Sequence, residues 1–324
     1  EFIVSNHAAA RAHTNIALIK YWGKKDTEFI LPMNNSLSLT LDHFYTDTSV
    51  TFDSSYTKDT FILNGKEIPN ENVHKFLNIV REKAGISEFA KVNSTNHVPT
   101  TAGLASSASA FAALAAAASK ASGMNLSRRD LSRLARRGSG SATRSIYGGF
   151  VEWQAGDNDL NSYAVPFIEN VSWDIKMIAV VINSKPKKIT SRAGMQTVVN
   201  TSPYYNSWIK EANRSIPLMK EAISKQDFTT MGELAEENAM KMHALNLSAH
   251  PHFSYFSPES IQVMNLVEEL RSMGIECYYT MDAGPNVKII CLGKDTASIT
   301  SFLQKNLPNT EVLVSSAGPG VQYL

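Results

Sequence analysis

The sequence predicts an α+β fold, in which helices pack on sheets in both halves of the chain. Three observations support this prediction. Short β-rich segments such as Tyr45–Phe52 dominate the region before Asn96. The alanine- and serine-rich segment Gly103–Gly123 is typical of a buried helix that lets its neighbours approach closely. From Ser257 onward, helix and strand patterns alternate.

The first region is predicted to consist mostly of strands. Tyr45–Phe52 alternates between apolar and polar residues, and Thr60–Leu63 is rich in residues that favour strands. Phe89–Val92 has the same character and precedes a turn. One helix, about His74–Lys83, interrupts these strands.

The middle region is predicted to pass from helices to buried strands. After the alanine-rich helix we expect a second helix at Leu131–Arg136 and a strand at Gly148–Trp153. Ile175–Asn183 is an uninterrupted apolar run, which indicates a strand buried on both faces. The basic segment Lys185–Lys188 that follows is expected to mark a domain junction.

Beyond the junction the composition favours helices, and one of them carries its own boundary signals. Ser257 is a suitable N-cap, Pro258 suits the first helical position and Gly274 suits the C-terminal stop. The remaining expected elements are strands at Glu276–Asp282 and Asn286–Leu292, a helix near Thr296–Lys305 and a strand at Glu311–Val314.

Length and composition predict a two-domain enzyme of small-molecule metabolism. A chain of 324 residues with 43% hydrophobic content can form two cores, which we place at residues 7–184 and 185–324. The 31 basic and 30 acidic side chains leave a net charge of +1, so no global field draws the chain to nucleic acid or membranes. Any anion site must be local.

The cysteines and the apolar runs predict a cytoplasmic protein. Cys277 and Cys291 are too few for a disulfide scaffold or a four-cysteine zinc site, which favours a reducing compartment. No run approaches the roughly 20 apolar residues that span a bilayer, and Glu1–His13 lacks the apolar middle of a signal peptide.

The turn Pro99–Ser109 is the first candidate for binding an anion. Its small residues lead directly into a helix, whose first N–H groups are unpaired and aligned with the helix dipole, as a phosphate site requires. It is neither a Walker A nor a dinucleotide motif. Ser106 or Ser107 could offer a hydroxyl to Mg²⁺. The alternative is a helix start chosen only for tight packing.

The segment Arg136–Arg144 is the second candidate. Its glycines and serines allow the backbone to reach an anion, and Arg144 supplies a bidentate donor for a carboxylate or phosphate. The alternative is a flexible turn beside a solvated basic helix end.

The third and fourth candidates place charges at strand ends. Asn15–Lys24 is an apolar strand that ends with Lys20 and Lys24 around two aromatic residues, which suits a charged substrate, although snorkelling lysines would look similar. Asp282 follows a strand at a tight turn, a position from which a base can act. Aspartate is also a common turn starter.

Together, the string Thr14–Lys24, the Pro99–Ser109 turn, the Gly138–Arg144 segment and the Asp282 turn resemble the diphosphomevalonate decarboxylase family of the GHMP kinase superfamily. They occur in family order and at family-like spacing from about Ala12 to beyond Val287. The resemblance implies a GHMP-kinase-like fold, in which the N-terminal α/β domain has a left-handed βαβ unit and the C-terminal domain is ferredoxin-like. The active site would lie in the cleft between them.

The resemblance also implies the activity and the roles of the residues. ATP would phosphorylate the 3-hydroxyl of mevalonate 5-diphosphate with Mg²⁺ present, and phosphate and CO2 would then leave isopentenyl diphosphate. The implied catalytic residues are Asp282, Lys20, Arg144 and Asn15. The implied substrate-binding residues are Tyr21, Trp22, Gly23, Lys24, Lys75, Ser139, Gly140, Ser141, Ala142, Thr143, Arg144, Ser191 and Arg192. The implied nucleotide-binding residues are Ser94, Asn96, Gly103, Leu104, Ala105, Ser106, Ser107 and Lys187, with Ser106 and Ser107 also near the metal. A homodimer is implied as well.

Two departures from the family pattern are visible, and two alternatives stay open. The turn contains Thr101 where the family usually has alanine, and Thr143 stands where serine or cysteine is commoner. One alternative is a kinase of the same superfamily that stops at the phosphorylated product. The other is a catalytically silent homologue that binds nucleotide and regulates a partner, because a fold does not certify activity.

Overall fold

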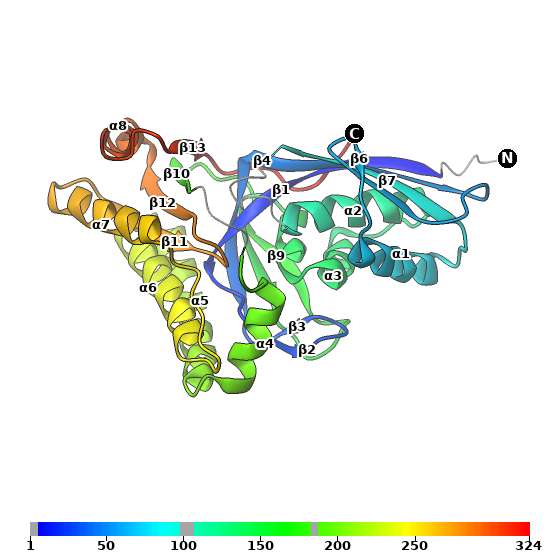
Figure 1. Cartoon of the computed structure of the whole chain (residues 1–324), viewed down its shortest axis with the longest axis horizontal. Coiled ribbons are helices and arrows are strands. Elements are labelled where there is room, and N and C mark those ends of the chain that lie inside the picture. The colour runs from blue at the N-terminus through cyan, green and yellow to red at the C-terminus, as the bar shows by residue number, and fades with distance from the viewer. Residues whose placement is uncertain (1–5, 98–106, 183–186) are drawn as a thin grey trace.

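The computed structural model describes residues 6–97, 107–182 and 187–324, and it contains two main sheets with helices packed on them (Figure 1). The larger sheet has eight strands in the order β14-β1-β4-β7-β5-β6, with β8 beside β4 and β9 beside β8. Its strands are β1 (His7–Ile19), β4 (Ser36–Asp53), β5 (Thr60–Leu63), β6 (Lys66–Glu67), β7 (Phe89–His97), β8 (Phe150–Gln154), β9 (Tyr163–Ile168) and β14 (Gln322–Tyr323). The predicted strands of the first region are thus confirmed, and β4 is much longer than its predicted part.

The helices beside the larger sheet are α1 (Glu71–Ala84), α2 (Ser107–Ala121), α3 (Arg128–Gly138) and the 3-10 helix η2 (Gly140–Ile146). Figure 1 shows α1, α2 and α3 gathered at this end of the molecule. Helix α2 packs on β1 and β4, and its alanines from Ala112 to Ala118 are buried. Small side chains let the helix approach the sheet closely, as predicted. The expected start of this helix at Gly103 lies outside the described residues.

The smaller sheet has four antiparallel strands in the order β11-β12-β10-β13. They are β10 (Ile175–Val181), β11 (Cys277–Met281), β12 (Val287–Leu292) and β13 (Glu311–Ser315). The helices that accompany this sheet are α4 (Ser191–Thr201), α5 (Tyr205–Ser224), α6 (Phe228–Leu247), α7 (Pro258–Ser272) and α8 (Thr296–Asn306). Every strand and helix predicted beyond Ser257 is present.

Helix α7 confirms the predicted boundary signals. The Ser257 hydroxyl accepts a hydrogen bond from the Ser260 amide, Pro258 occupies the first turn, and Gly274 follows the helix with a positive φ of 83°. This left-handed conformation favours glycine because it has no Cβ. Within the described ranges, none of the helices combines the length and the apolar character that crossing a bilayer requires.

One hydrophobic core joins the two sheets. It includes Leu18 and Leu39 from the larger sheet, Met177 from the smaller sheet, and Trp208 and Met219 from α5. The chain also crosses between the sheets twice. It passes from β9 to β10 and returns from β13 to β14, which pairs with β1. The smaller sheet is therefore joined to the larger one by two strand connections and by a shared core.

Candidate active site

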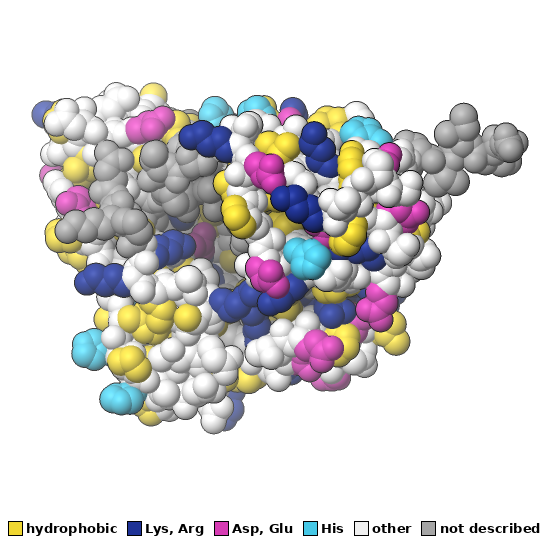
Figure 2. Space-filling model, turned by 45° about the vertical axis from the view of Figure 1, so that its right-hand side comes forward, with side chains coloured by type: hydrophobic (Ala, Val, Ile, Leu, Met, Phe, Trp, Pro, Cys, Tyr) yellow, Lys and Arg dark blue, Asp and Glu magenta, His cyan; other side chains and the backbone are white. Residues whose placement is uncertain are grey.

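A pocket of about 470 Å³ lies where β1, η2, α4 and the β11–β12 turn meet, and most of the predicted site residues line it. The predicted residues that line the pocket are Asn15, Lys20, Tyr21, Trp22, Lys24, Ser107, Ser139, Gly140, Ser141, Arg144, Lys187, Ser191, Arg192 and Asp282. Figure 2 shows lysine and arginine side chains gathered around a hollow in one face of the molecule. The fold thus concentrates cations from separate segments of a nearly neutral chain.

An ion pair between Lys20 and Asp282 joins the two halves of the site. Lys20 Nζ lies 2.8 Å from Asp282 Oδ1, although the residues are 262 positions apart in the sequence. Lys20 follows β1 and is only 2% exposed, whereas Asp282 follows β11 and is partly exposed to the pocket. Lys20 Nζ also donates to the Ala17 carbonyl at 2.9 Å. The ammonium group is therefore fixed against one carboxylate oxygen of Asp282.

The neighbouring cations keep Asp282 ionised. Burial raises the pKa of Asp282, but the ammonium groups of Lys20 and Lys288 outweigh burial and hold this pKa well below its usual range. Lys288 Nζ lies 3.6 Å from Asp282 Oδ2. Burial lowers the pKa of Lys20, and the Asp282 carboxylate opposes that shift. The group facing the pocket is thus an ionised carboxylate that can accept a hydrogen bond.

Arg144 lies in the same pocket, and hydrogen bonds to two buried residues hold its guanidinium group in place. Its Nη1 donates to Ser36 Oγ at 2.6 Å, and its Nε donates to Asn15 Oδ1 at 3.2 Å. Asn15 is itself fixed because its Nδ2 donates to Ser145 Oγ at 2.7 Å. Within the described part of the chain, Nη2 of Arg144 has no hydrogen-bond partner, which leaves it for an anion in the pocket. Burial lowers the pKa of Arg144 to about 10, and the group stays charged at neutral pH.

The glycine- and serine-rich segment that contains Ser139 and Gly140 borders the same pocket. Ser139 Oγ lies 3.0 Å from Ser107 Oγ, so the residue that precedes η2 and the first residue of α2 present their hydroxyls together. A Cβ on Gly140 would lie 2.8 Å from the Trp153 ring and 2.9 Å from the Tyr21 ring. The glycine is therefore needed for close packing against these aromatic residues, and the segment is part of the pocket wall.

Tyr21 and Trp22 form an apolar wall with one free polar group. Tyr21 packs against Trp153 with ring centroids 4.8 Å apart, and its buried hydroxyl has no hydrogen-bond partner among the described residues. Trp22 is buried, and its indole N–H donates to Asn246 Oδ1 at 2.9 Å. An unpaired buried hydroxyl is costly unless a ligand pairs with it. The Tyr21 hydroxyl therefore marks a place for a polar substrate group.

Lys24, Lys187 and Arg192 extend the positive charge toward the outer part of the pocket. Burial and the Arg192 guanidinium lower the pKa of Lys24 to about 8. Burial and Lys288 lower the pKa of Lys187, while Asp282 opposes this shift. Cations held this close together repel one another until an anion enters. The arrangement suits a polyanionic ligand.

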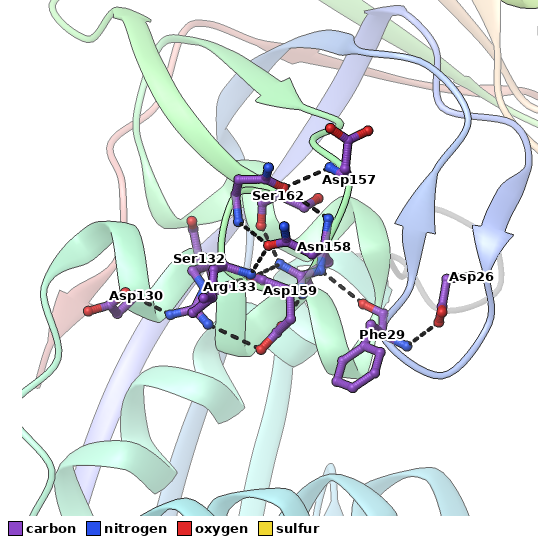
Figure 3. Close-up of polar contacts among 12 residues, drawn as sticks. Asp26, Phe29, Asp130, Ser132, Arg133, Asp157, Asn158, Asp159 and Ser162 are labelled. Atoms are coloured by element: carbon purple, nitrogen blue, oxygen red, sulfur yellow. Dashed lines mark hydrogen bonds and ion pairs between the residues drawn. The ribbon is translucent and has the colours of Figure 1, made fainter.

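A buried arginine fixes the hairpin that carries Lys24. The hairpin consists of β2 (Lys24–Asp26) and β3 (Leu31–Pro32), and Arg136 Nε donates to the Phe29 carbonyl between them at 2.9 Å. Arg136 also contacts Asp159 and the Ser162 carbonyl in the loop after β8. Figure 3 shows this polar cluster around Asp159. Arg136 therefore has a structural role, although it belongs to the second candidate segment.

The structure places several predicted residues away from the pocket lining. Ala142 and Thr143 are fully buried within η2. Ser94 and Asn96 lie on β7, where their side chains are hydrogen-bonded to Thr48 and Thr46 of β4. Gly23 adjoins Tyr205, whose hydroxyl a Cβ would meet at 1.8 Å. These residues therefore lie outside the pocket lining, in segments that support it. Their contacts with ligands remain predictions.

Two further predictions concern Lys75 and the turn Pro99–Ser109. Lys75 is exposed on α1, 3.9 Å from Glu71, and it lines a separate pocket that adjoins the main one. Lys75 was predicted to bind the substrate, and the structure does not bring it into the main pocket. Gly103, Leu104, Ala105 and Ser106 lie outside the described residues.

The structure also adds residues that the sequence reasoning missed. Lys288 and Asn286 line the pocket beside Asp282, and Ser36 holds Arg144 from β4. Lys288 was hidden inside a run predicted only as an apolar strand, Asn286–Leu292. A lone lysine in such a run is the signal that could have revealed it, because a buried ammonium group needs a charged partner.

Comparisons with known proteins find relatives that extend over nearly the whole chain. Residues 12–164 match the diphosphomevalonate decarboxylase-like N-terminal domain, and residues 177–319 match the mevalonate 5-diphosphate decarboxylase C-terminal domain. The chain is 36% identical to the diphosphomevalonate decarboxylase of Ganoderma lucidum, over 94% of this chain and 83% of the relative. It is similar to the crystal structure of mevalonate diphosphate decarboxylase from Staphylococcus aureus, with a TM-score of 0.95, 50% identity and 98% of each chain covered. A solved structure described as MDDEF in complex with MVAPP, AMPPCP and magnesium has a TM-score of 0.94 and 49% identity, again over 98% of each chain.

Proposed function

The chain belongs to the diphosphomevalonate decarboxylase family, and from this premise we propose that it converts (R)-5-diphosphomevalonate to isopentenyl diphosphate in an ATP-dependent decarboxylation. ADP, phosphate and CO2 are the co-products. The observation that carries the proposal is one pocket that contains both the Lys20–Asp282 ion pair and Arg144. The carboxylate suits an alcohol, and the guanidinium suits the substrate's carboxylate.

Asp282 acts in the first step. Its carboxylate orients the substrate's 3-hydroxyl and accepts its proton as the hydroxyl oxygen bonds to the γ-phosphorus of ATP. The bond between that phosphorus and the ADP oxygen breaks, and ADP leaves. Lys20, fixed 2.8 Å from Asp282, stabilises negative charge on the oxygens that react. Most of the acceleration in phosphoryl transfer comes from such positioning and charge stabilisation.

Arg144 and the aromatic wall act in the second step. The bond from C3 to the phosphate oxygen breaks, and phosphate leaves with the bonding electrons. The bond between the carboxylate carbon and C2 then supplies the electrons of the new double bond, and CO2 departs. Arg144 holds the carboxylate in position, while Tyr21 and Trp22 keep water from the cationic carbon. Because the carboxylate loses its charge here, orientation contributes more than tight binding.

The described residues fit magnesium that arrives on the nucleotide. Among residues 6–97, 107–182 and 187–324, no group of three His, Cys, Asp or Glu side chains could hold a metal ion by itself. Mg²⁺ often keeps several waters and binds through substrate phosphates with few protein ligands. The hydroxyl of Ser107 at the pocket suits this mode, and we propose the same role for Ser106. The bound ion would neutralise charge on the phosphates, and Lys187 would contact them from α4's side of the pocket.

We propose a GHMP-kinase-like organisation for the chain, with domains at residues 7–184 and 185–324. The parallel pairing of β5 with β7 across α1 supports the βαβ unit, for which we propose the left-handed form. The four-stranded antiparallel sheet with helices supports a ferredoxin-like second domain. We also propose a cytoplasmic homodimer. Sedimentation equilibrium of the full chain tests the dimer.

One assay separates the proposed function from its alternatives. The protein is incubated with ATP, Mg²⁺ and mevalonate 5-diphosphate, and ADP and CO2 are measured together. We expect equal amounts of the two products. A kinase that stops at the 3-phosphate would release ADP without CO2, and a silent homologue would release neither.

The pKa of Lys24 gives a pH prediction. Lys24 is charged below about pH 8 and loses its proton as the pH rises through that value. If it contacts the substrate diphosphate, kcat/KM falls above about pH 8, because this ratio reports the free enzyme. Lys24→Arg, whose charge persists, is expected to remove this decline. An unchanged alkaline limb in Lys24→Arg would assign the decline to another group.

A further inference from the structure

Helix α6 contacts the main chain at Lys20 and at Met281, the residue before Asp282. Asn238 Oδ1 accepts a hydrogen bond from the Lys20 backbone N–H at 2.9 Å. His243 Nε2 lies 3.0 Å from the carbonyl of Met281. We propose that Asn238 and His243 are positioning residues that hold Lys20 and Asp282 in the geometry needed for reaction. This proposal rests on the proposed function.

The Asn238 contact replaces a missing sheet interaction. The pairing of β1 with β4 ends at Ile19 and Leu37, so Lys20 lies beyond the last paired residue. Two buried amides hold its peptide groups instead: Asn238 accepts from the N–H, and Asn34 Nδ2 donates to the carbonyl at 2.8 Å. The N–H and the carbonyl of Lys20 are thus both paired in the core, where an unpaired backbone group would be costly. The backbone from which the Lys20 side chain projects is thereby fixed on two sides.

The His243 contact fixes the other partner. A carbonyl can only accept, so Nε2 carries the proton and donates to Met281. Burial lowers the pKa of His243 to about 4, so the neutral ring keeps this donor at physiological pH. Met281 is the last residue of β11, and Asp282 begins the turn that follows. The hydrogen bond therefore fixes the strand end from which the carboxylate projects.

The two contacts come from one rigid element. Asn238 and His243 lie within α6, which also holds the Trp22 indole through Asn246. Without α6, the distance between Lys20 and Asp282 would depend on two segments that are far apart in the sequence and belong to different sheets. Misplacing a reacting group by about 1 Å can cost about 100-fold in rate. A helix that binds both backbones directly limits such errors.

The test compares kcat with KM in variants of the full chain. In Asn238→Leu the contact is lost while the number of side-chain heavy atoms is kept, and in His243→Leu it is lost with little change in side-chain volume. We expect kcat for CO2 release to fall about 10- to 100-fold. We expect KM for both substrates to stay within about threefold, because the groups that bind the diphosphate and the nucleotide are unchanged. His243→Gln can place an amide donor near the Met281 carbonyl and is expected to recover most of the lost kcat.

Met231→Ala is the matched control. Met231 is a buried core residue of the same helix and is not among the residues that line the pocket. Its truncation is expected to lower the unfolding temperature while leaving kcat unchanged at temperatures where the variant is folded. Asn238→Ser, which removes the long amide without adding apolar bulk, repeats the test if Asn238→Leu does not fold.

The outcomes are distinct. Reduced kcat with nearly constant KM, together with recovery in His243→Gln, supports the positioning role. Unchanged kcat in folded Asn238→Ser and His243→Leu overturns it, even if their unfolding temperatures are lower. If the unmodified protein releases no CO2 from mevalonate 5-diphosphate, the proposed function fails instead.

Discussion

Asp282→Asn is expected to reduce release of phosphate and CO2 by about 1,000-fold or more, while ATP binding remains nearly intact. Asparagine has the size of aspartate, but it cannot accept the proton of the 3-hydroxyl. The Asp282 carboxylate contacts Lys20 at 2.8 Å and lies near Lys288. ATP binding is expected to remain because the variant leaves Lys187, the proposed nucleotide contact in the pocket, unchanged. Product release is measured in the ADP and CO2 assay, and ATP affinity is measured by calorimetry.

The Asp282 experiment requires a check of folding. The variant leaves the Lys20 ammonium group buried without its charged partner, so some stability is lost with the ion pair. Thermal unfolding therefore accompanies the assay. Asp174→Asn is the matched control, because Asp174 is an exposed carboxylate that pairs with Lys176 on the surface. Normal turnover in Asp282→Asn would remove Asp282 from the mechanism.

Arg144→Lys is expected to lower turnover by about 100-fold or more. The guanidinium is held by Ser36 and Asn15 through Nη1 and Nε, which leaves Nη2 for the substrate. A lysine ammonium group retains the charge, but it cannot make these two contacts and also present a planar donor edge. Steady-state kinetics with mevalonate 5-diphosphate measures the effect.

The matched control for Arg144 is Arg128→Lys. Arg128 pairs with Glu169 at 2.6 Å on the surface and is more than half exposed, so the same substitution there is expected to leave turnover unchanged. If Arg144→Lys retains activity within about threefold of the unmodified protein, Arg144 has only a structural role.

Much of the fold was predictable because its local signals agree with its tertiary packing. Ser257, Pro258 and Gly274 lie at the ends of α7 as their capping preferences require. Helix α2 packs on β1 and β4, and its small buried alanines permit close contact. The N-terminal part of β4 was not predicted, although Ser36–Leu41 alternates between polar and apolar residues in the sequence, and all six residues are buried in the structure.

The site was predictable where charge or glycine interrupts an apolar pattern. Lys20 and Asp282 both follow strands, and the structure brings them together. Asn238 and His243 gave no such signal, because a buried polar residue inside a helix looks the same in a sequence as one facing solvent. Lys75 was predicted from the family resemblance, and its exposed position on α1 shows that a resemblance does not locate a single side chain in space.

The two strand connections between the sheets constrain how the pocket can open. The chain passes from β9 to β10 and returns from β13 to β14, and Gly318 on the return path packs so closely that a Cβ would lie 2.3 Å from the Leu41 backbone. A single covalent link would leave one sheet free to swivel on the other. Two connections and a shared core oppose such a swivel, so the walls that the two sheets contribute to the pocket keep their relative positions.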